Sequence, residues 1–383
     1  MGSNAARHAM KVLHIIATNF VGGPEKQILL HAEEARRRQV GVYIGSFLDS
    51  ASEPEILGVA RKHGFQTLAI KSSGRSIISA ANQIRAYIRA NRIDVLCTHG
   101  YKANIVGWFT SQVIDLPRIA VVRGWTAETR AVSLYERVER MTLRRTRFVI
   151  CVSRMQAEHL KRLGGRRQDI TVIPNCVPSI APDVLHNRKG LRTRFNWSDE
   201  NFVVVSAGRL SREKGQHDLI EAVGLLGSKI PHLRVVILGE GRELKALRLQ
   251  AEELGVSGKV EFAGFQRDVL EWLRAADLCV NPSLTEGVPN VVLESMSVGT
   301  PVLATAVGGV PDIVQDGISG ALIPAAQPST LADTLFRMAM SPSERQRLVA
   351  GALRALENLT PSLQCDRFLR VYEAALAAKA RRK

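Results

Sequence analysis

Short apolar runs rich in β-branched residues alternate with longer segments of helical periodicity along the first part of the chain. The segments 25–38 and 79–90, for example, repeat apolar residues at helical spacing and are predicted to be helices. Such alternation is typical of βαβ units, whose parallel strands form a sheet that helices cover on both faces. The expected strands are 11–16, 42–47, 93–98, 119–122, 148–152 and 170–173.

The alternation pauses and then starts again at residue 202. The segment 179–200 is rich in proline, asparagine and charged residues, which predicts a linker. We therefore expect an α/β fold of two Rossmann-like domains, 10–178 and 201–361. In two-domain folds of this kind the final helix often packs back on the first domain, and we expect this of the helix predicted at 362–380. Strands of the second domain are expected at 202–206, 233–238, 259–263, 278–281, 301–305 and 320–323.

The composition of the 383 residues is that of a globular protein, with 45% apolar residues. No apolar run approaches the roughly 20 residues of a membrane span, and residues 1–10 lack the apolar core of a signal peptide. The five cysteines include no C-x-x-C pair, and Cys97, Cys151 and Cys279 lie in apolar runs. These features predict buried, reduced thiols in a cytoplasmic protein.

Positive charge is concentrated in the first half of the chain. Residues 1–180 hold 27 Lys and Arg against 13 Asp and Glu, a net charge of +14, whereas the remaining residues hold 25 against 23, a net of +2. This asymmetry indicates an acidic partner for the first half, either nucleic acid or an anionic membrane surface. The alternative is a solvated basic surface without a partner.

Part of this charge lies in the segment 130–147, which contains six arginines and two glutamates. Leu134, Val138 and Met141 fall on one helical stripe, which predicts an amphipathic helix lying on an anionic membrane surface. In the alternative reading, the same stripe packs on the sheet of its own domain. The arginines that crowd the rest of the helix are Arg137, Arg140, Arg144 and Arg145.

The loop after the first predicted strand contains Gly22 and Gly23, followed by Pro24. Glycines let the backbone approach a ligand closely, and proline is favoured at the first position of a helix. Free amides at such a helix start can bind phosphate. A tight βα turn without a ligand explains the loop equally well.

A second motif, Gly208-Arg209-Leu210-Ser211-Arg212-Glu213-Lys214-Gly215, directly follows the first strand of the second domain. Arg209 and Lys214 are therefore expected at the carboxyl end of that strand, the edge where doubly wound sheets bind ligands. Two cations there can neutralise a departing diphosphate without a metal.

A third motif follows the strand predicted at 278–281. Glu286 is expected in a loop, and Glu294 on a helix whose start is marked by Pro289. The loop, the helix amides and the helical carboxylate then converge on one ligand. Carboxylates accept hydrogen bonds from ribose and sugar hydroxyls, so the pair suits a sugar nucleotide.

Taken in order, these motifs resemble those of the retaining, GT-B-fold glycosyltransferases called group 1 or family 4. The segment 172–175 resembles the exit from the first domain of those enzymes, and 304–320, with Gly308-Gly309-Val310-Pro311-Asp312, resembles their C-terminal signature. The resemblance covers about residues 11–375 and is most specific in the C-terminal half. It implies two Rossmann-like domains that face each other across a cleft holding the donor.

The resemblance also implies a role for each matched residue. Gly22 and Gly23 are expected against the donor diphosphate and the acceptor, and His99 is expected to face the sugar. Arg209 and Lys214 would bind the diphosphate, Glu286 the sugar hydroxyls and Glu294 the ribose, with backbone amides from Asn290 and Val291. The expected catalytic residues are thus His99, Glu286, Arg209 and Lys214, and the expected donor-binding residues are Gly22, Gly23, Arg209, Lys214, Asn290, Val291 and Glu294.

One departure concerns the acceptor. The family often has a His-Asp or His-Gly pair after a later strand of the first domain, where this chain has Arg123-Gly124-Trp125. Acceptors of the family bind in that domain, so the motif leaves the acceptor class open.

The sequence as a whole predicts a hexosyltransferase that moves a sugar from a nucleotide diphosphate sugar, with UDP favoured, to a lipid-linked or polysaccharide acceptor. The expected context is synthesis of bacterial cell-surface glycans such as lipopolysaccharide, at the inner face of the cytoplasmic membrane. No D-x-D motif is present, so neither metal nor other cofactor is expected. A UDP-sugar 2-epimerase of the same fold is the alternative enzyme. A nucleic-acid-binding protein is disfavoured by the 5% aromatic content and the lack of an RNA motif.

Overall fold

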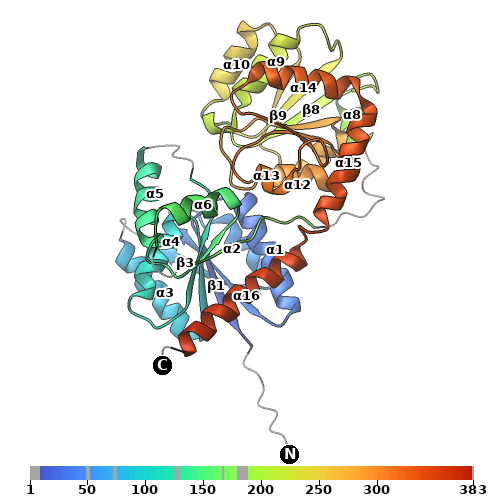
Figure 1. Cartoon of the computed structure of the whole chain (residues 1–383). Coiled ribbons are helices and arrows are strands. Elements are labelled where there is room, and N and C mark those ends of the chain that lie inside the picture. Colours follow the sequence, from blue (N-terminus) through green and yellow to red (C-terminus); the bar gives the residue numbers. More distant parts are fainter. Residues whose placement is uncertain are drawn as a thin grey trace, which may run out of the picture. The chain divides into compact units, whose positions relative to one another are not determined.

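The computed structural model describes residues 9–48, 52–71, 76–125, 130–165, 168–178 and 189–381 (Figure 1). The chain forms two compact units. The N-terminal unit comprises residues 1–173 and 361–383, and the C-terminal unit comprises residues 174–360. Each unit has one parallel sheet flanked by helices, which confirms the predicted α/β fold of two Rossmann-like domains.

The sheet of the N-terminal unit has the order β3-β2-β1-β4-β5-β6-β7, and all its strand pairs are parallel. Every strand predicted in this half is present, and β3 is an additional one. In this edge strand only Ile70 is fully buried, so the apolar run that marks the other strands is missing. The strands are β1 (Lys11–Ile16), β2 (Gly41–Leu48), β3 (Gln66–Lys71), β4 (Val95–His99), β5 (Arg118–Val122), β6 (Phe148–Cys151) and β7 (Asp169–Val172).

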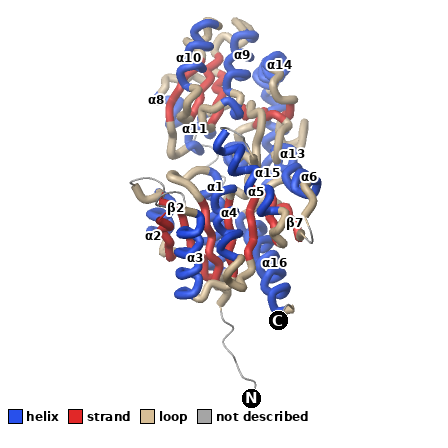
Figure 2. Tube along the Cα trace, turned by 90° about the vertical axis from the view of Figure 1, so that its left-hand side faces the viewer, coloured by secondary structure: helices blue, strands red, loops and turns tan. Residues whose placement is uncertain are grey.

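Helices cover both faces of this sheet, with α3 and α16 on opposite sides of it (Figure 2). Side chains alternate along β1, so Leu13 and Ile15 join the core formed with α3 and α4, whereas His14 points toward α1 and α16. The final helix therefore belongs to the N-terminal unit. The helices are α1 (Gly23–Arg37), α2 (Glu55–Lys62), α3 (Ile77–Asn91), α4 (Tyr101–Ser111), α5 (Arg130–Leu143), α6 (Arg154–Arg162) and α16 (Pro361–Ala380).

The sheet of the C-terminal unit has the order β10-β9-β8-β11-β12-β13 and is also parallel throughout. Its strands agree with the predicted ones to within a residue or two at each end. They are β8 (Phe202–Ala207), β9 (Leu233–Leu238), β10 (Val260–Gly264), β11 (Leu278–Asn281), β12 (Val302–Thr305) and β13 (Ala321–Ile323).

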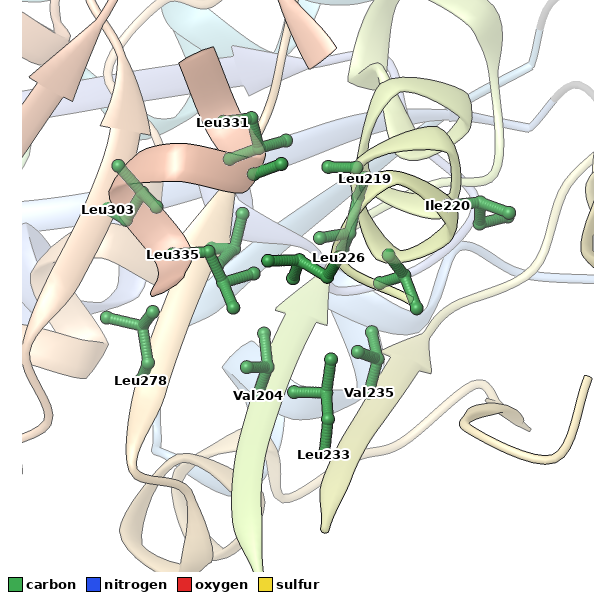
Figure 3. Close-up of a cluster of buried hydrophobic side chains, with 14 of the residues drawn as sticks. Val204, Leu219, Ile220, Leu226, Leu233, Val235, Leu278, Leu303, Leu331 and Leu335 are labelled. Carbon is green, nitrogen blue, oxygen red and sulfur yellow. The ribbon is translucent and has the colours of Figure 1, made fainter. Parts of the chain in front are cut away.

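One core of this unit lies between the sheet and the helices α9 and α14. Figure 3 shows Leu219 and Leu226 of α9 and Leu331 and Leu335 of α14 directed toward Val204 of β8. Burial of this much aliphatic surface fixes the sheet that carries the motif loops. The helices are α8 (Lys189–Arg194), the 3₁₀ turn η2 (Arg212–Lys214), α9 (Gln216–Leu226), α10 (Leu244–Glu253), α11 (Val269–Ala275), α12 (Asn290–Ser297), α13 (Val310–Ile313), α14 (Pro328–Met340) and α15 (Pro342–Leu356).

The predicted linker 179–200 needs a correction. Residues 179–188 lie outside the described part of the chain, but α8, within 189–200, packs on α11 of the C-terminal unit. The buried guanidinium of Arg192 donates to the carbonyl of Ala275 at 2.9 Å and to the carboxylate of Asp277 at 3.2 Å. Because α8 is short and highly charged, its periodicity did not distinguish it from a linker.

Two expectations from composition can be compared with the structure. All five cysteines are free and buried, as expected for the three in strands. Among the helices in the described ranges, none has both the length and the apolar character needed to cross a membrane.

Candidate active site

The strand order of each sheet reverses at one point, between β1 and β4 in the N-terminal unit and between β8 and β11 in the C-terminal unit. Loops diverge at such a point, and open α/β sheets bind ligands there, at the carboxyl ends of the strands. Gly22 and Gly23 follow β1, and His99 ends β4. Arg209 follows β8, and Glu286 follows β11. Each motif thus lies at the ligand-binding edge of its own sheet.

Lys214 and Glu286 form an ion pair in the C-terminal unit. The Lys214 ammonium donates to Oε1 of Glu286 at 2.7 Å, and the hydroxyl of Ser283 donates to the same oxygen at 2.7 Å. The Glu286 side chain is only 7% exposed, while that of Lys214 is 24% exposed. The carboxylate is therefore fixed by two donors, and the cation reaches toward solvent at the edge of the sheet. Arg209, at the end of β8, is exposed.

The loop that carries Glu286, residues 282–288, is held between two glycines. Gly215 and Gly308 both have left-handed backbone conformations, with φ of +65° and +58°. A Cβ atom at Gly215 would lie 2.1 Å from the carbonyl oxygen of Pro282, and one at Gly308 would lie 1.9 Å from that of Glu286. Only glycine allows these approaches, so both motif glycines set the position of the Glu286 loop.

The start of α12 is fixed by a residue of the segment 172–175 that was not among the expected site residues. The side-chain amide of Asn175 donates to the carbonyl of Val288 and to the side-chain oxygen of Asn290, each at 2.8 Å. This contact gives Asn175 a structural role in the C-terminal unit. Val291 lies in the first turn of α12, and the half-buried Glu294 lies one turn further along.

A second unpredicted residue is Asn281, the last residue of β11. Its side chain is buried, and its Nδ2 has no hydrogen-bond partner among the described residues. A buried amide of this kind costs free energy unless a ligand or water satisfies it. An asparagine ending a strand at the switch point is the sequence signal that could have identified it.

The glycine loop of the N-terminal unit differs from the expected row of free amides. The amide of Gly22 donates to the carboxylate of Glu25 at 2.9 Å, and the amide of Val21 donates to that of Glu55 at 3.1 Å. Glu25 is buried below the loop, and burial raises the pKa of its carboxyl. The first-turn glutamate thus occupies a donor that a phosphate would otherwise use, as in a capping box.

His99 lies within the N-terminal unit and is only 2% exposed. Its Nε2 lies 2.9 Å from Nδ1 of His14, and its Nδ1 lies 3.1 Å from a guanidinium nitrogen of Arg123. Burial, together with the nearby Arg123, lowers the pKa of His99 well below its usual value. Both ring nitrogens are therefore engaged by protein groups. His14 could have been suspected from sequence, because a histidine inside the apolar run of β1 needs a buried partner.

One group in the described ranges has the chemistry of metal ligands. The ligand atoms of His14, Cys97 and His99 lie within 4.8 Å of one another. The two imidazoles already share a hydrogen bond, and burial raises the pKa of the Cys97 thiol to about 12. A metal ion here would have to break that hydrogen bond and deprotonate the thiol.

The amphipathic helix predicted at 130–147 is present as α5, but its apolar stripe does not pack on the sheet. Leu134 is 62% exposed and Met141 is 48% exposed. The buried face carries Glu136 and Glu139 instead, and Glu139 accepts hydrogen bonds from Asn104 at 2.6 Å and from the Trp125 indole at 2.8 Å. The reading in which this stripe forms part of the core is therefore wrong.

Comparison with known proteins gives matches over both units. A family model described as glycosyl transferases group 1 matches residues 187–354, and one described as glycosyltransferase family 4 matches residues 21–179. A D-inositol 3-phosphate glycosyltransferase of Thermomonospora curvata is 32% identical over 313 residues, 74% of this chain and 72% of that protein. The lipopolysaccharide core biosynthesis glycosyltransferase LpsE of Rhizobium meliloti is 33% identical over 62% of this chain and 66% of its own.

Solved structures share the fold. Anabaena HepE in complex with UDP-glucose matches 95% of this chain and 100% of its own with a TM-score of 0.81, at 21% identity. Together with the two parallel sheets, this match supports the GT-B fold expected from the motifs.

Proposed function

Since the chain belongs to the group 1 glycosyltransferases, we propose that it moves a hexosyl group from a UDP-sugar to a lipid-linked or polysaccharide acceptor, with retention at the anomeric carbon. The expected context is synthesis of a bacterial cell-surface glycan. The HepE complex with UDP-glucose supports a UDP-sugar donor, and LpsE supports an acceptor of the lipopolysaccharide type.

The observation that carries this proposal is the Lys214–Glu286 pair at the switch point of the C-terminal sheet. A buried carboxylate can accept hydrogen bonds from hydroxyls of the transferred sugar. The adjacent ammonium, with Arg209, can stabilise the negative charge that develops on the departing diphosphate. These cations would supply that stabilisation without a metal ion.

The remaining predicted residues complete the donor site in this proposal. Asn290 and Val291 offer amides at the start of α12, where the helix dipole favours a phosphate. Glu294, one turn along the same helix, accepts hydrogen bonds from the ribose hydroxyls. Gly22 and Gly23 let the backbone of the N-terminal unit approach the diphosphate and the acceptor.

A donor screen tests the proposal. Binding and slow hydrolysis of UDP-, GDP- and ADP-sugars are measured with the parent protein and with Lys214→Ala. Lys229→Ala is the matched control, because Lys229 is exposed and lies between α9 and β9, before the strand rather than at its carboxyl end. We expect UDP-sugar turnover that Lys214→Ala reduces and Lys229→Ala leaves unchanged. Release of a 2-epimerised sugar without hydrolysis would instead favour the epimerase.

We also propose that α5 docks the enzyme on anionic lipid. The exposed Leu134 and Met141 lie on the same helix as the exposed Arg137, and the exposed Arg145 follows in the turn after that helix. Apolar side chains beside arginines suit the boundary between acyl chains and anionic headgroups. Each well-placed arginine contributes about 1 kcal/mol to such binding, and salt weakens it.

Vesicle sedimentation tests the docking. The parent protein should bind vesicles containing phosphatidylglycerol, bind neutral vesicles poorly, and lose binding at high salt. Arg137→Gln with Arg145→Gln should remove the preference, whereas Lys62→Gln with Arg89→Gln, an equal charge loss at exposed sites of α2 and α3, should retain most of it. Equal binding to both lipids, or binding to neither, would contradict the proposal.

A further inference from the structure

Phe20 is an exposed aromatic residue at the switch point of the N-terminal sheet. It lies in the loop between β1 and α1 and is 58% exposed. The strand order reverses between β1 and β4, so this loop lies where open α/β sheets bind ligands. Single exposed apolar residues are common on protein surfaces, so the exposure of Phe20 alone does not indicate a ligand. The construction of its loop does.

Although exposed, Phe20 is held in one place by the protein. The Thr18 hydroxyl donates to the Phe20 carbonyl at 2.7 Å and accepts from the Phe20 amide at 3.3 Å. The ring rests beside Gly22, where a Cβ atom would lie 2.8 Å from the ring carbon Cε2 and would push the ring aside. An exposed ring that is fixed in this way binds a ligand with less loss of conformational entropy than a mobile one.

The polar groups of the loop limit what can bind there. The amides of Val21 and Gly22 donate to the carboxylates of Glu55 and Glu25, which a phosphate would have to displace. A lipid chain needs a continuous apolar surface, whereas the neighbours Asn19 and Glu55 are polar and exposed. The loop therefore presents one aromatic face among polar groups, which suits an uncharged ligand with an apolar face and hydroxyls around it.

Further aromatic side chains lie at the same edge of the sheet. Tyr101 is the first residue of α4, directly after β4, the neighbour of β1 at the switch point. Its ring stacks on that of Tyr135 of α5, with centroids 5.7 Å apart and planes inclined by 27°. Tyr135 is 42% exposed. In a chain with only 5% aromatic residues, three elements thus bring aromatic rings to this edge.

We propose that Phe20 binds the acceptor by stacking on the C–H face of its terminal sugar ring, at an edge that Tyr101 and Tyr135 also line. The face of an aromatic ring is negative and attracts the slightly positive hydrogens of C–H bonds. Hydroxyls around the sugar ring can donate to carboxylate and hydroxyl oxygens of the protein. The proposed donor residues lie mainly in the C-terminal unit, which leaves this edge for the second substrate. The assignment to an acceptor rests on the proposed function, and it specifies the end of a glycan rather than a phosphate or a lipid chain.

Saturation-transfer NMR of the full-length protein with UDP tests the stacking without requiring turnover. The probes are methyl pyranosides of glucose, galactose, mannose and N-acetylglucosamine, with myo-inositol 1-phosphate and farnesyl phosphate as the competing classes. At least one pyranoside should receive saturation, most strongly at its ring C–H protons. Phe20→Ala should weaken its binding roughly fivefold or more, and Phe20→Tyr should retain it. Phe109→Ala, which removes a 37%-exposed aromatic residue of α4, is the matched control and should bind like the parent.

Phe20→Leu distinguishes stacking from simple apolar contact, because leucine keeps the apolar bulk and lacks the aromatic face. It should bind the pyranoside as weakly as Phe20→Ala does. The proposal is overturned if leucine restores binding, if Phe20→Ala binds like the parent, or if the parent binds no pyranoside. Saturation only of the inositol phosphate or of the farnesyl chain would overturn it too. Failure of the parent to turn over any nucleotide sugar would instead refute the proposed function and leave a sugar-binding site that is not an acceptor site.

Discussion

Replacing Gly308 with alanine should damage the donor site through the backbone of the Glu286 loop. The new Cβ atom would lie 1.9 Å from the carbonyl oxygen of Glu286. A carbon–oxygen contact needs about 3.3 Å, so the loop has to retreat by roughly 1.4 Å. A shift of that size takes the Glu286 carboxylate, now 2.7 Å from both Lys214 and Ser283, out of hydrogen-bond range of at least one of them.

Two free-energy terms set the expected magnitude. An alanine in the left-handed conformation costs about 1 kcal/mol, and losing a hydrogen bond to a charged group costs about 2 kcal/mol. The sum of about 3 kcal/mol corresponds to a fall in Tm of roughly 6–12 °C for a unit of this size. Displacement of the carboxylate should also weaken binding of the donor identified by the screen at least tenfold, or about 1.4 kcal/mol.

The variant Gly317→Ala separates the cost of backbone strain from the effect of displacing the Glu286 loop. Gly317 also has a left-handed conformation, with φ of +68°, but no atom lies within 4 Å of the position of its Cβ. The free energy of unfolding of this control should fall by about 1 kcal/mol, and its Tm by roughly 2–4 °C. Its affinity for the donor should equal that of the parent. Calorimetric unfolding measures the Tm, and titration with the donor identified by the screen measures the affinity. If the two variants show equal Tm and equal Kd, the glycine contact does not position Glu286.

Further predictions concern the donor site and a buried carboxyl. Arg209→Ala and Lys214→Ala should each reduce turnover by roughly 10²–10³-fold while EDTA has little effect; loss on chelation with recovery in Mn²⁺ would contradict metal-free catalysis. Glu294→Ala should weaken donor binding by about 1–3 kcal/mol in calorimetric titration without unfolding the protein, and unaltered affinity would rule out the ribose contact. Burial raises the pKa of Glu139 from 4.5 to about 7. Between pH 4.5 and about 7, Glu139 therefore keeps its proton in the folded protein and loses it in the unfolded chain. Its contribution to stability is fully present below pH 4.5 and is lost as the pH rises through about 7, by about 3 kcal/mol. The free energy of unfolding, measured in urea, should be lower at pH 8 than at pH 5 in the parent, and this difference should be smaller in Glu139→Gln. An identical pH dependence of the two proteins would refute the raised pKa of Glu139.

Periodicity predicted most of the fold because most strands are buried on both faces. Such strands are continuous apolar runs, and the βα order fixes a parallel sheet. The edge strand β3 and the helix α8 were not predicted because neither is an apolar run buried on both faces. Their position depends on pairing with β2 and on contacts such as Arg192 with Asp277, which join residues far apart in sequence.

The place of Arg209, Lys214 and Glu286 in the fold was predictable for a related reason. All three lie in the loops after β8 and β11, so strand order alone brings them to one edge. Tyr372 and His14 are 358 positions apart, and no local pattern signals that they share a hydrogen bond. Periodicity also left the orientation of α5 open, since its apolar stripe could face either a membrane or the sheet. In the structure, hydrogen bonds to Glu139 from Asn104 of α4 and from Trp125 fix the opposite face against the rest of the N-terminal unit.

The position of α16 has a consequence for synthesis of the protein. The helix completes the N-terminal unit, yet it is translated after the whole of the C-terminal unit, residues 174–360. Until then, the nascent N-terminal unit exposes the face of its sheet that Phe368 and Tyr372 cover in the finished molecule. At about 5–20 residues per second, the ribosome leaves that face open for roughly ten seconds or more while the second unit is made. The part translated first is therefore completed last, and in that interval an apolar face of its sheet lacks the helix that covers it.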